Sequence, residues 1–422
     1  MPFAFLSGCF TLGLSMEDSK RLTFRFERWR AFSGGIIETA GTTFLLLIAV
    51  KQFQAGATAK ALVAAAGSVG LMLSPLSVSV AESLKLPTAR AASRLLAFGA
   101  LCFLVMAALP FLPVFVLGSV LALTSGTAAI PLVTQMYQDN YPEKERGRLF
   151  SKTVMIRIAT AAVFSHLAGL ALTDRIDRFP WLLLCFGAAM GLGSYALHRC
   201  PSRPLVSAGG THPFRSLRFA REDPLFRRTL VCWMLMGFAN LMMLPLRVEY
   251  LANPKYGLAL NAASVALLVG VIPNVARLIL SPLWGWLFDH MNFFALRVVL
   301  NLGYAIGIIS FFTGQEMWAL VAGAIVFGVA NAGGDVAWSL WVTKFAAPER
   351  VADYMSVHTF FTGVRGLLAP LAAFHLASQV SLATLGWLSM GMILASCLLL
   401  LPEIKWGKSA RPASALVEEV SE

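Results

Sequence analysis

The stretch SPLWGWLFDHMNFFALR (residues 281–297) separates two of the most apolar segments of this chain. The tripeptide SPL also occurs at residues 74–76, and moving the chain along itself by 207 residues superposes the two copies. At this offset or one residue further on, other residues of like kind coincide: Glu82 with Asp289, Arg90 with Arg297, Gly126 with Gly333, and Arg157 with Arg365. Repetition over half the chain predicts two structural repeats in the same orientation.

The composition identifies the solvent in which the repeats fold. Of the 422 residues, 57% are hydrophobic and 13% are charged, and the mean hydropathy is +0.71. Soluble domains carry about 25% charged residues, so this chain has too little polar surface to cover a water-soluble core of its size. The chain is therefore predicted to be an integral membrane protein that crosses the bilayer many times.

Apolar segments of the length that spans a bilayer, about 20 residues, occur twelve times along the sequence. None shows the strict alternation of a membrane β-strand, so we predict an all-α protein with two six-helix bundles. The expected parts are an N-terminal segment 1–28, a first bundle 29–198, a basic linker 199–228, a second bundle 229–402 and a tail 403–422. Met16, which precedes a charged segment, is expected to be the true start of the chain.

The distribution of positive charge predicts the orientation. Most of the 34 lysines and arginines fall in segments on the same side as the N-terminus, including seven in the linker. Cytoplasmic loops are enriched in these residues, so both termini are expected in the cytoplasm, with the chain in the plasma (inner) membrane. The basic residues are scattered over loops beside lipid, so the net charge of +12 does not indicate nucleic-acid binding.

The junction at 281–297 resembles the cytoplasmic motif of the major facilitator superfamily, in which a glycine, an acid, a basic residue and an arginine join the second and third helices of a half. Gly285, Asp289, His290 and Arg297 stand at those positions. The first half matches less well, with only Glu82 and Arg90 in place. The resemblance implies two pseudo-symmetric six-helix bundles, a secondary transporter rather than an enzyme, and a cytoplasmic latch at these residues, with the glycine at a helix contact and the acid paired to an arginine.

Ionisable side chains within membrane segments are costly and mark functional sites. Arg277 lies twelve residues from Asp289, a depth of about 18 Å at 1.5 Å per residue, and similar counts bring other charged groups near the midplane. The residues proposed to bind solute or a coupling proton are Glu38, Arg157, Asn274, Arg277, Asn331, Asp335, Trp338 and Arg365. Arg157 with Arg365, or Arg277 with Asp335, are alternatively braces that fix helix packing.

Three arginines against two acids at this depth favour an anionic solute, and a buried carboxyl is suited to carrying a coupling proton. The alternative is a proton-coupled exporter of amphipathic or cationic compounds, with Glu38 and Asp335 as counter-ions. A non-transporting receptor on the same fold is a third hypothesis. The sequence holds no nucleotide-binding loop and no metal-ligand spacing, so we expect no cofactor and no metal. The protein is expected to be a monomer in the lipid bilayer, with a small-molecule solute as its partner.

Overall fold

The computed structural model describes residues 15–204, 215–344 and 351–404. Twelve of the helices in this part of the chain are long and apolar enough to cross a membrane, and the same residues form no strand beyond a single bridge between Pro87 and Pro204. The predicted all-α class with twelve spans is confirmed.

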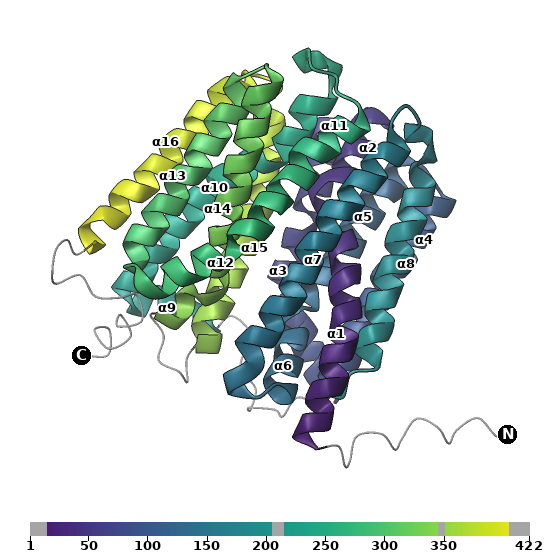
Figure 1. The fold of residues 1–422 in the computed structure, drawn as a ribbon, viewed down its shortest axis with the longest axis vertical. Coiled ribbons are helices and arrows are strands. Elements are labelled where there is room, and N and C mark those ends of the chain that lie inside the picture. The colour runs from purple at the N-terminus through teal and green to yellow at the C-terminus, as the bar shows by residue number, and fades with distance from the viewer. Residues whose placement is uncertain (1–14, 205–214, 345–350, 405–422) are drawn as a thin grey trace.

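The first six spans form one bundle (Figure 1). Its helices are α1 (Met16–Thr39) and α2 (Leu45–Lys51), joined by a π-helical turn at Ala40–Phe44, then α3 (Ala57–Ser83), α4 (Thr88–Ala108), α5 (Leu112–Ala128), α6 (Ile130–Asn140), α7 (Glu143–Leu172) and α8 (Phe179–His198). Within it, α1 packs on α7 and α8, and α4 packs on α5 and α8.

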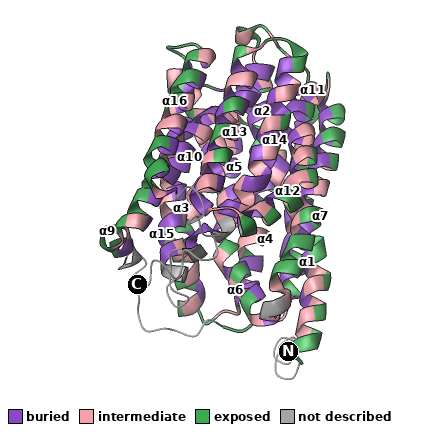
Figure 2. Ribbon diagram, turned by 60° about the vertical axis from the view of Figure 1, so that its left-hand side comes forward, coloured by how far each residue is buried: buried purple, intermediate pink, exposed green. Residues whose placement is uncertain are grey.

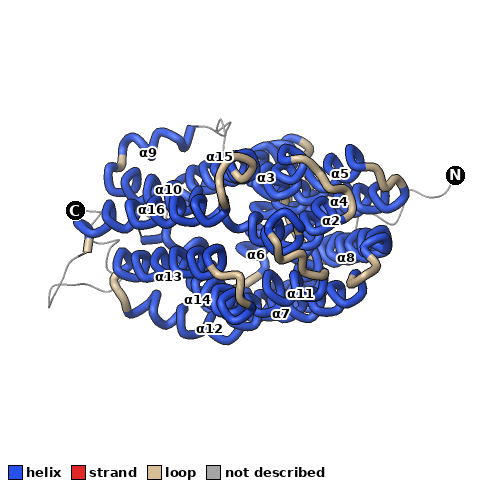
Figure 3. The backbone as a smooth tube through the Cα atoms, turned by 90° about the horizontal axis from the view of Figure 1, so that it is seen from above, coloured by secondary structure: helices blue, strands red, loops and turns tan. Residues whose placement is uncertain are grey.

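The last six spans form the second bundle, which follows the short helix α9 (Phe219–Glu222). Its helices are α10 (Pro224–Ala252), α11 (Ala262–Ala266) and α12 (Ile272–His290), joined by a second π-helical turn at Leu267–Val271, then α13 (Phe293–Thr313), α14 (Met317–Leu340), α15 (Val351–Leu376) and α16 (Leu382–Leu400). The two bundles meet along α3 against α15 and along α7 against α11 and α12. In the view from above (Figure 3), the first pair lies near one long edge of the molecule and the other three helices near the opposite edge.

We call the end that carries Met16 and His290 the inner end, and the end that carries Lys51 and Ala262 the outer end, after the predicted orientation. Large apolar side chains lie on the outside of the molecule, such as Trp318 and Trp181 with 74% and 70% of their surface exposed. Exposed, half-buried and buried residues alternate along each helix (Figure 2). This pattern is expected where lipid rather than water surrounds the helices, because the outer faces then need no polar cover.

Helix α1 begins at Met16, well before the predicted bundle boundary between residues 28 and 29. The hydroxyl of Ser15 caps it by accepting a hydrogen bond from the Asp18 backbone N–H at 3.1 Å. On the inner turns of this helix, Glu27 is fully buried and is held by two partners. Arg30 Nε donates to Glu27 Oε1 at 2.5 Å, and the Tyr137 hydroxyl of α6 donates to Glu27 Oε2 at 2.5 Å. Residues 1–14, ahead of the expected start at Met16, lie outside the described residues.

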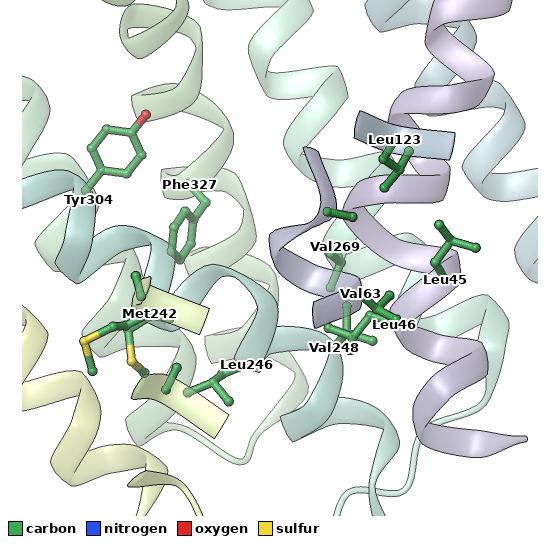
Figure 4. Packing of buried hydrophobic residues seen from close by; sticks show 14 of the residues in the cluster. Leu45, Leu46, Val63, Leu123, Met242, Leu246, Val248, Val269, Tyr304 and Phe327 are labelled. Atoms are coloured by element: carbon green, nitrogen blue, oxygen red, sulfur yellow. The ribbon is translucent and has the colours of Figure 1, made fainter. Parts of the chain in front are cut away.

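A layer of buried apolar side chains closes the outer half of the interface between the bundles. Leu46 and Val63 come from the first bundle, and Val248 and Val269 from the second, with at most 5% of any of them exposed. Figure 4 shows these four side chains gathered at one place. Leu46 is eight residues beyond Glu38 on the first span, about 12 Å nearer the outer end. We call these four residues the outer seal.

Candidate functional site

Four of the predicted charged residues form one continuous chain of ion pairs between the bundles, which we call the central network. Glu38 Oε2 lies 3.2 Å from Arg157 Nε, and Glu38 Oε1 accepts a hydrogen bond from Arg277 Nη1 at 2.5 Å. Arg277 Nε also donates to Asp335 Oδ2. Arg157 and Glu38 belong to the first bundle, and Arg277 and Asp335 belong to the second, so the Glu38–Arg277 pair joins the two halves.

The helices that carry the joining pair both contain a π-helical turn on the outer side of it. Glu38 stands two residues before the turn Ala40–Phe44, and Arg277 follows the turn Leu267–Val271 in its own span. The two turns contact each other. A π-helical turn accommodates one extra residue and is frequent at functional sites. Because such a turn changes the direction in which later side chains point, the turn Leu267–Val271 helps to aim Arg277 across the interface.

The side chains of the network are only partly buried. Arg157 and Asp335 keep 39% and 43% of their side-chain surface exposed, whereas Glu38 keeps 21% and Arg277 keeps 10%. The chain of ion pairs that joins the four side chains runs across the interface between the bundles. The network holds two arginines and two carboxylates and is therefore balanced in charge.

Asn274 and Asn331 take different places around the network. Asn274 lies one turn before Arg277, and its Oδ1 accepts a 3.4 Å hydrogen bond from Arg277 Nη1. Asn331 instead accepts a 3.0 Å hydrogen bond from the Tyr304 hydroxyl of α13, inside the second bundle. Asn274 therefore belongs to the network, whereas Asn331 links α14 to α13 within the second bundle.

Trp338 and Arg365 lie apart from the central network. The Trp338 ring packs against His358 of α15, with 5.6 Å between ring centres. Arg365 is 9% exposed and donates through Nη1 to the backbone carbonyl of Trp233 on α10. Depth along the helix predicted that Arg365 would face the space between the bundles, but its position on α15 turns it into the second bundle. Arg365 is thus no neighbour of Glu38.

The described residues show only part of the predicted cytoplasmic latch. Among them, a Cβ added to Gly285 would meet nothing within 4 Å, so no close helix contact is described at this glycine. His290 is exposed and stacks on Trp286, 4.7 Å between ring centres. Arg297 is 2% exposed and lies inside the second bundle rather than on the inner surface, because α13 begins at Phe293 and turns this side chain inward.

The other latch residues add no ion pair to those that the structure describes. The side chain of Asp289 lies outside the described residues, although its backbone belongs to α12. Glu82 and Arg90 flank the short connection between α3 and α4 and are each half-buried, and neither takes part in an ion pair among the described residues. The proposed role of this segment in gating stays a prediction.

One ion pair between the halves was not predicted. Lys60 Nζ of α3 lies 2.6 Å from Glu249 Oε1 of α10, at the outer end, and Glu249 is 2% exposed. Asn253 Nδ2 also donates to Glu249 Oε1, at 2.7 Å. Lys60 and Glu249 flank the outer seal and are separated by 189 residues. The positions of both at the ends of apolar segments were the only signal in the sequence.

A second group that sequence reasoning missed holds the inner end of the first bundle. It consists of Glu27, Arg30 and Tyr137, with Tyr141 stacked on Tyr137 at 5.5 Å between ring centres. Burial and the charge of Glu27 raise the pKa of the Tyr141 hydroxyl and of the nearby Cys200 thiol. Both groups therefore stay neutral, and every polar atom of Glu27 has a partner, which is typical of a structural brace.

Hydrogen bonds between the halves, as far as the described residues show, lie at the level of Glu38–Arg277 or nearer the outer end. Besides that pair and Lys60–Glu249, Thr58 Oγ1 lies 3.4 Å from His375 Nε2, and the backbone N–H of Ala263 donates to Thr173 Oγ1 at 3.1 Å. Together with the outer seal, these contacts close the outer end. The described residues hold no group of three or more His, Cys, Asp or Glu that could bind a metal ion.

Comparison with known proteins shows what this arrangement is similar to. No protein-family model matches the sequence, and no curated protein matches it. Among solved structures, a mutant of the nucleoside transporter NupG matches with a TM-score of 0.74 at 13% identity, over 91% of this chain and all (100%) of that one.

Two further structures match nearly as well. The xylose transporter XylE from E. coli, in an inward open conformation, has a TM-score of 0.66 at 14% identity and covers 96% of this chain and 99% of its own. A POT family transporter in complex with a thioalcohol-conjugated peptide has a TM-score of 0.68 at 12% identity, over 92% and 96%. These neighbours are membrane transporters rather than enzymes. The chain therefore has the fold of the major facilitator superfamily, as the motif at residues 281–297 predicted.

Proposed function

We propose that this protein is a secondary transporter that moves a small organic anion across the membrane by alternating access, coupled to a proton. The observation that carries the proposal is the position of Glu38, whose two carboxylate oxygens are bound by arginines from opposite bundles. Arginine pairs with carboxylates through charge-assisted hydrogen bonds of defined geometry. A site in which a carboxylate already bridges Arg157 and Arg277 is a site that a substrate carboxylate also fits.

The balance of charge supports coupling to a proton. With Glu38 ionised, both arginines are neutralised and an anion gains little by approaching. A proton on Glu38 removes its charge. The two positive guanidinium groups are then balanced by only one negative charge of the network, that of Asp335, which pairs with Arg277. A substrate carboxylate restores the balance by taking the position of Glu38. Proton binding and anion binding thus favour each other, which is the thermodynamic requirement for coupled transport.

The same exchange links binding to the movement of the bundles. The Glu38–Arg277 pair is the ion pair that joins the halves at mid-depth, so its release changes the free energy of the contact between them. A ligand shifts a conformational equilibrium only through different interactions with the two states. Here the difference lies in whether Arg277 is bound to Glu38 of the other bundle or to the substrate.

A cationic or amphipathic substrate is the second candidate, and one observation favours it. Asp335 keeps 43% of its side-chain surface exposed and is the more accessible of the two acids of the network. A cation would bind there and compete with Arg277. In that case neutralising Asp335 would abolish substrate binding, whereas neutralising Arg277 would preserve it.

The experiment is a thermal-stability screen of the purified protein against small carboxylates and small organic cations, followed by uptake into proteoliposomes. We expect stabilisation by a subset of the carboxylates. Arg277→Lys keeps the charge but loses the planar pair of donors, so the affinity for the best carboxylate should fall by about tenfold or more. Arg178→Lys, at an exposed position near the outer end, is the matched control and should bind it normally.

The outcomes separate the hypotheses. Stabilisation by cations alone, lost in Asp335→Asn and kept in Arg277→Lys, would replace the anion proposal with the cation one. Binding of a carboxylate that never leads to uptake, with or without a pH gradient, would contradict a transporter and favour a receptor on this fold.

A further inference from the structure

A second group of cationic side chains lies inside the second bundle, away from the central network. Arg297 of α13 stacks on the Trp233 ring of α10, with Cζ 3.4 Å from the ring centre. Arg365 of α15 donates to the Trp233 backbone carbonyl. His358, two turns before Arg365 on the same helix, has its ring centre 5.3 Å from that of Trp233. Trp233 therefore brings two arginines and an imidazole together.

These three side chains are buried, and most of their nitrogen atoms have no hydrogen-bond partner. Arg297 is 2%, Arg365 9% and His358 0% exposed. Among the described residues, both terminal nitrogens of Arg297, the Nε of Arg365 and both ring nitrogens of His358 have no hydrogen-bond partner. The positive charges of Arg297 and Arg365 also act on each other. No ion pair that the structure describes involves either arginine.

The arginine of the first half that corresponds to Arg365 has a negatively charged partner. In the first half, the side chain of Arg157 lies against Gly34 of α1, with Cδ 3.7 Å from the position of an added Cβ. Glu38, one turn after this glycine, supplies the carboxylate that pairs with Arg157. The arginine thus has a glycine that makes room for it and an acid that neutralises it.

The second half keeps the arginine and the glycine but not the acid. Arg365, which matches Arg157 at an offset of 208 residues, lies against Gly237 of α10, where an added Cβ would come within 2.7 Å of its Nε. One turn after Gly237 stands Leu241, which has no charge, and the repeat offset of 207 to 208 residues places Pro245 and Leu246 opposite Glu38. By either comparison, the position that Glu38 fills in the first half is apolar in the second.

Burying a guanidinium group without a counter-charge is strongly unfavourable, because arginine does not lose its proton at physiological pH. Stacking on Trp233 recovers only part of this cost through the cation–π interaction. We propose that a small inorganic anion of the halide class binds inside the second bundle, between Arg297 and Arg365 and beside His358. The anion supplies the negative charge that Glu38 supplies in the first half.

A monatomic anion suits the surroundings better than a larger oxyanion. Arg365 is pressed against the backbone of α10 at Gly237, and aromatic rings enclose the group on other sides. His358 meets Trp233 edge-on, with 65° between the rings. Ring edges carry partial positive charge and favour an anion, and a halide needs no additional donors in a fixed arrangement.

The test is thermal unfolding of the detergent-solubilised protein in sodium chloride, bromide, sulfate or gluconate, with ionic strength held constant. A ligand that binds the folded state raises the melting temperature as it saturates its site. We expect chloride and bromide to raise it by about 2 °C or more relative to gluconate. Equal melting temperatures in all four salts, or a rise with sulfate alone, would overturn the proposal.

Variants assign the effect to the site. Arg297→Gln and Arg365→Gln should each lose most of the halide-dependent shift, whereas Arg178→Gln, an exposed arginine, should keep it. A shift that persists in both site variants would place the anion elsewhere and contradict the proposal. Crystals of the wild-type protein grown in bromide provide a measurement that needs no variant, because we expect an anomalous scattering peak between the two guanidinium groups. A bromide peak only elsewhere would refute the site. None of these measurements depends on transport.

Discussion

Glu38 has two oxygens, and each is bound by an arginine from a different half of the molecule. This gives one proton-accepting group control over two cations at once. Arg157 pairs with Glu38 within the first half, whereas the pair of Glu38 with Arg277 joins the two halves and requires them to be close. The chemistry of the proposed cycle therefore depends on a single carboxylate.

Glu38→Gln should uncouple anion binding from pH. In the wild-type protein a proton must bind before the arginines are released, so carboxylate affinity should fall as pH rises, by up to about tenfold per pH unit for one linked proton. Glutamine carries no charge and leaves both arginines available, so affinity should be high and independent of pH. The measurement is binding of the best carboxylate by titration between pH 5 and 8. Glu145→Gln, which alters a pair with Lys20 at the inner end, should retain the wild-type dependence.

The sequence predicted the central network better than its surroundings. Counting residues from charged loops gives depth, since each residue adds 1.5 Å to a helix, and Glu38, Arg277 and Asp335 do meet. Depth leaves open which side of the helix a residue occupies. Arg365 has a suitable depth, but it faces α10 and not the other bundle. No count along the chain distinguishes these two directions.

Glycines set how closely the helices of the two bundles approach. Gly363 of α15 lies against α3, where an added Cβ would come within 2.8 Å of the Met72 nitrogen and 2.9 Å of the Ser68 carbonyl oxygen. Both are backbone atoms, which do not move aside without moving the helix. Small residues allow this approach in membrane proteins, where packing rather than the hydrophobic effect holds helices together.

Gly363→Ala should therefore separate α3 from α15. We expect a loss of about 1–3 kcal/mol in the free energy of unfolding, the usual cost of overpacking, and faster reaction of a cysteine introduced at Ser68 with hydrophilic maleimide. The matched control is Gly391→Ala on α16, where an added Cβ meets nothing within 4 Å. That change should be neutral or stabilising, because alanine favours helix more than glycine. Equal effects of the two substitutions would show that the contact is not tight.

The elements themselves followed from hydropathy, but their irregularities did not. Twelve apolar segments predicted twelve spans, whereas the π-helical turns at Ala40–Phe44 and Leu267–Val271 leave no recognisable trace in composition. Their sequences, AGTTF and LLVGV, have in common only that each contains one glycine. Such turns depend on tertiary packing, here on each other and on Ser165, whose Cβ lies 2.8 Å from the position of an added Cβ at Gly270.

For the molecule as a whole, the contacts between the halves gather toward the outer end. The Lys60–Glu249 pair and the outer seal act there together. Lys60→Met removes the charge that neutralises buried Glu249 and should favour opening of the outer end. In a protein without native cysteines, a cysteine at Thr42, which is exposed beside the network, should then react several-fold faster with an impermeant maleimide added from outside.

The control for this measurement is Lys51→Met, at the outer end of the first span. Lys51 forms no ion pair with the second bundle in the part of the chain that the structure describes, so labelling at position 42 should not change. If Lys60→Met also left the labelling rate unchanged, the Lys60–Glu249 pair would have no role in holding the outer end closed.

The orientation inferred from positive charge is tested separately. Reporters fused after Arg218 and after Glu422 should be active in the cytoplasm, and a reporter after Lys255 should be active on the external side. A cytoplasmic signal at Lys255 would invert the assignment of inner and outer ends and require a new account of which side the outer seal closes.

The charge balance of the central network has a consequence for the energetics of transport. If one proton on Glu38 enters with one monocarboxylate, the loaded site carries the same net charge as the empty site. No net charge then crosses the bilayer in a cycle, whereas each uncompensated charge would couple to about 2.3 kcal/mol per 100 mV of membrane potential. Uptake driven by a pH gradient should therefore proceed at the same rate in proteoliposomes whether the voltage is clamped to zero with potassium and valinomycin or set to −100 mV, and a dicarboxylate should be slowed by the negative interior.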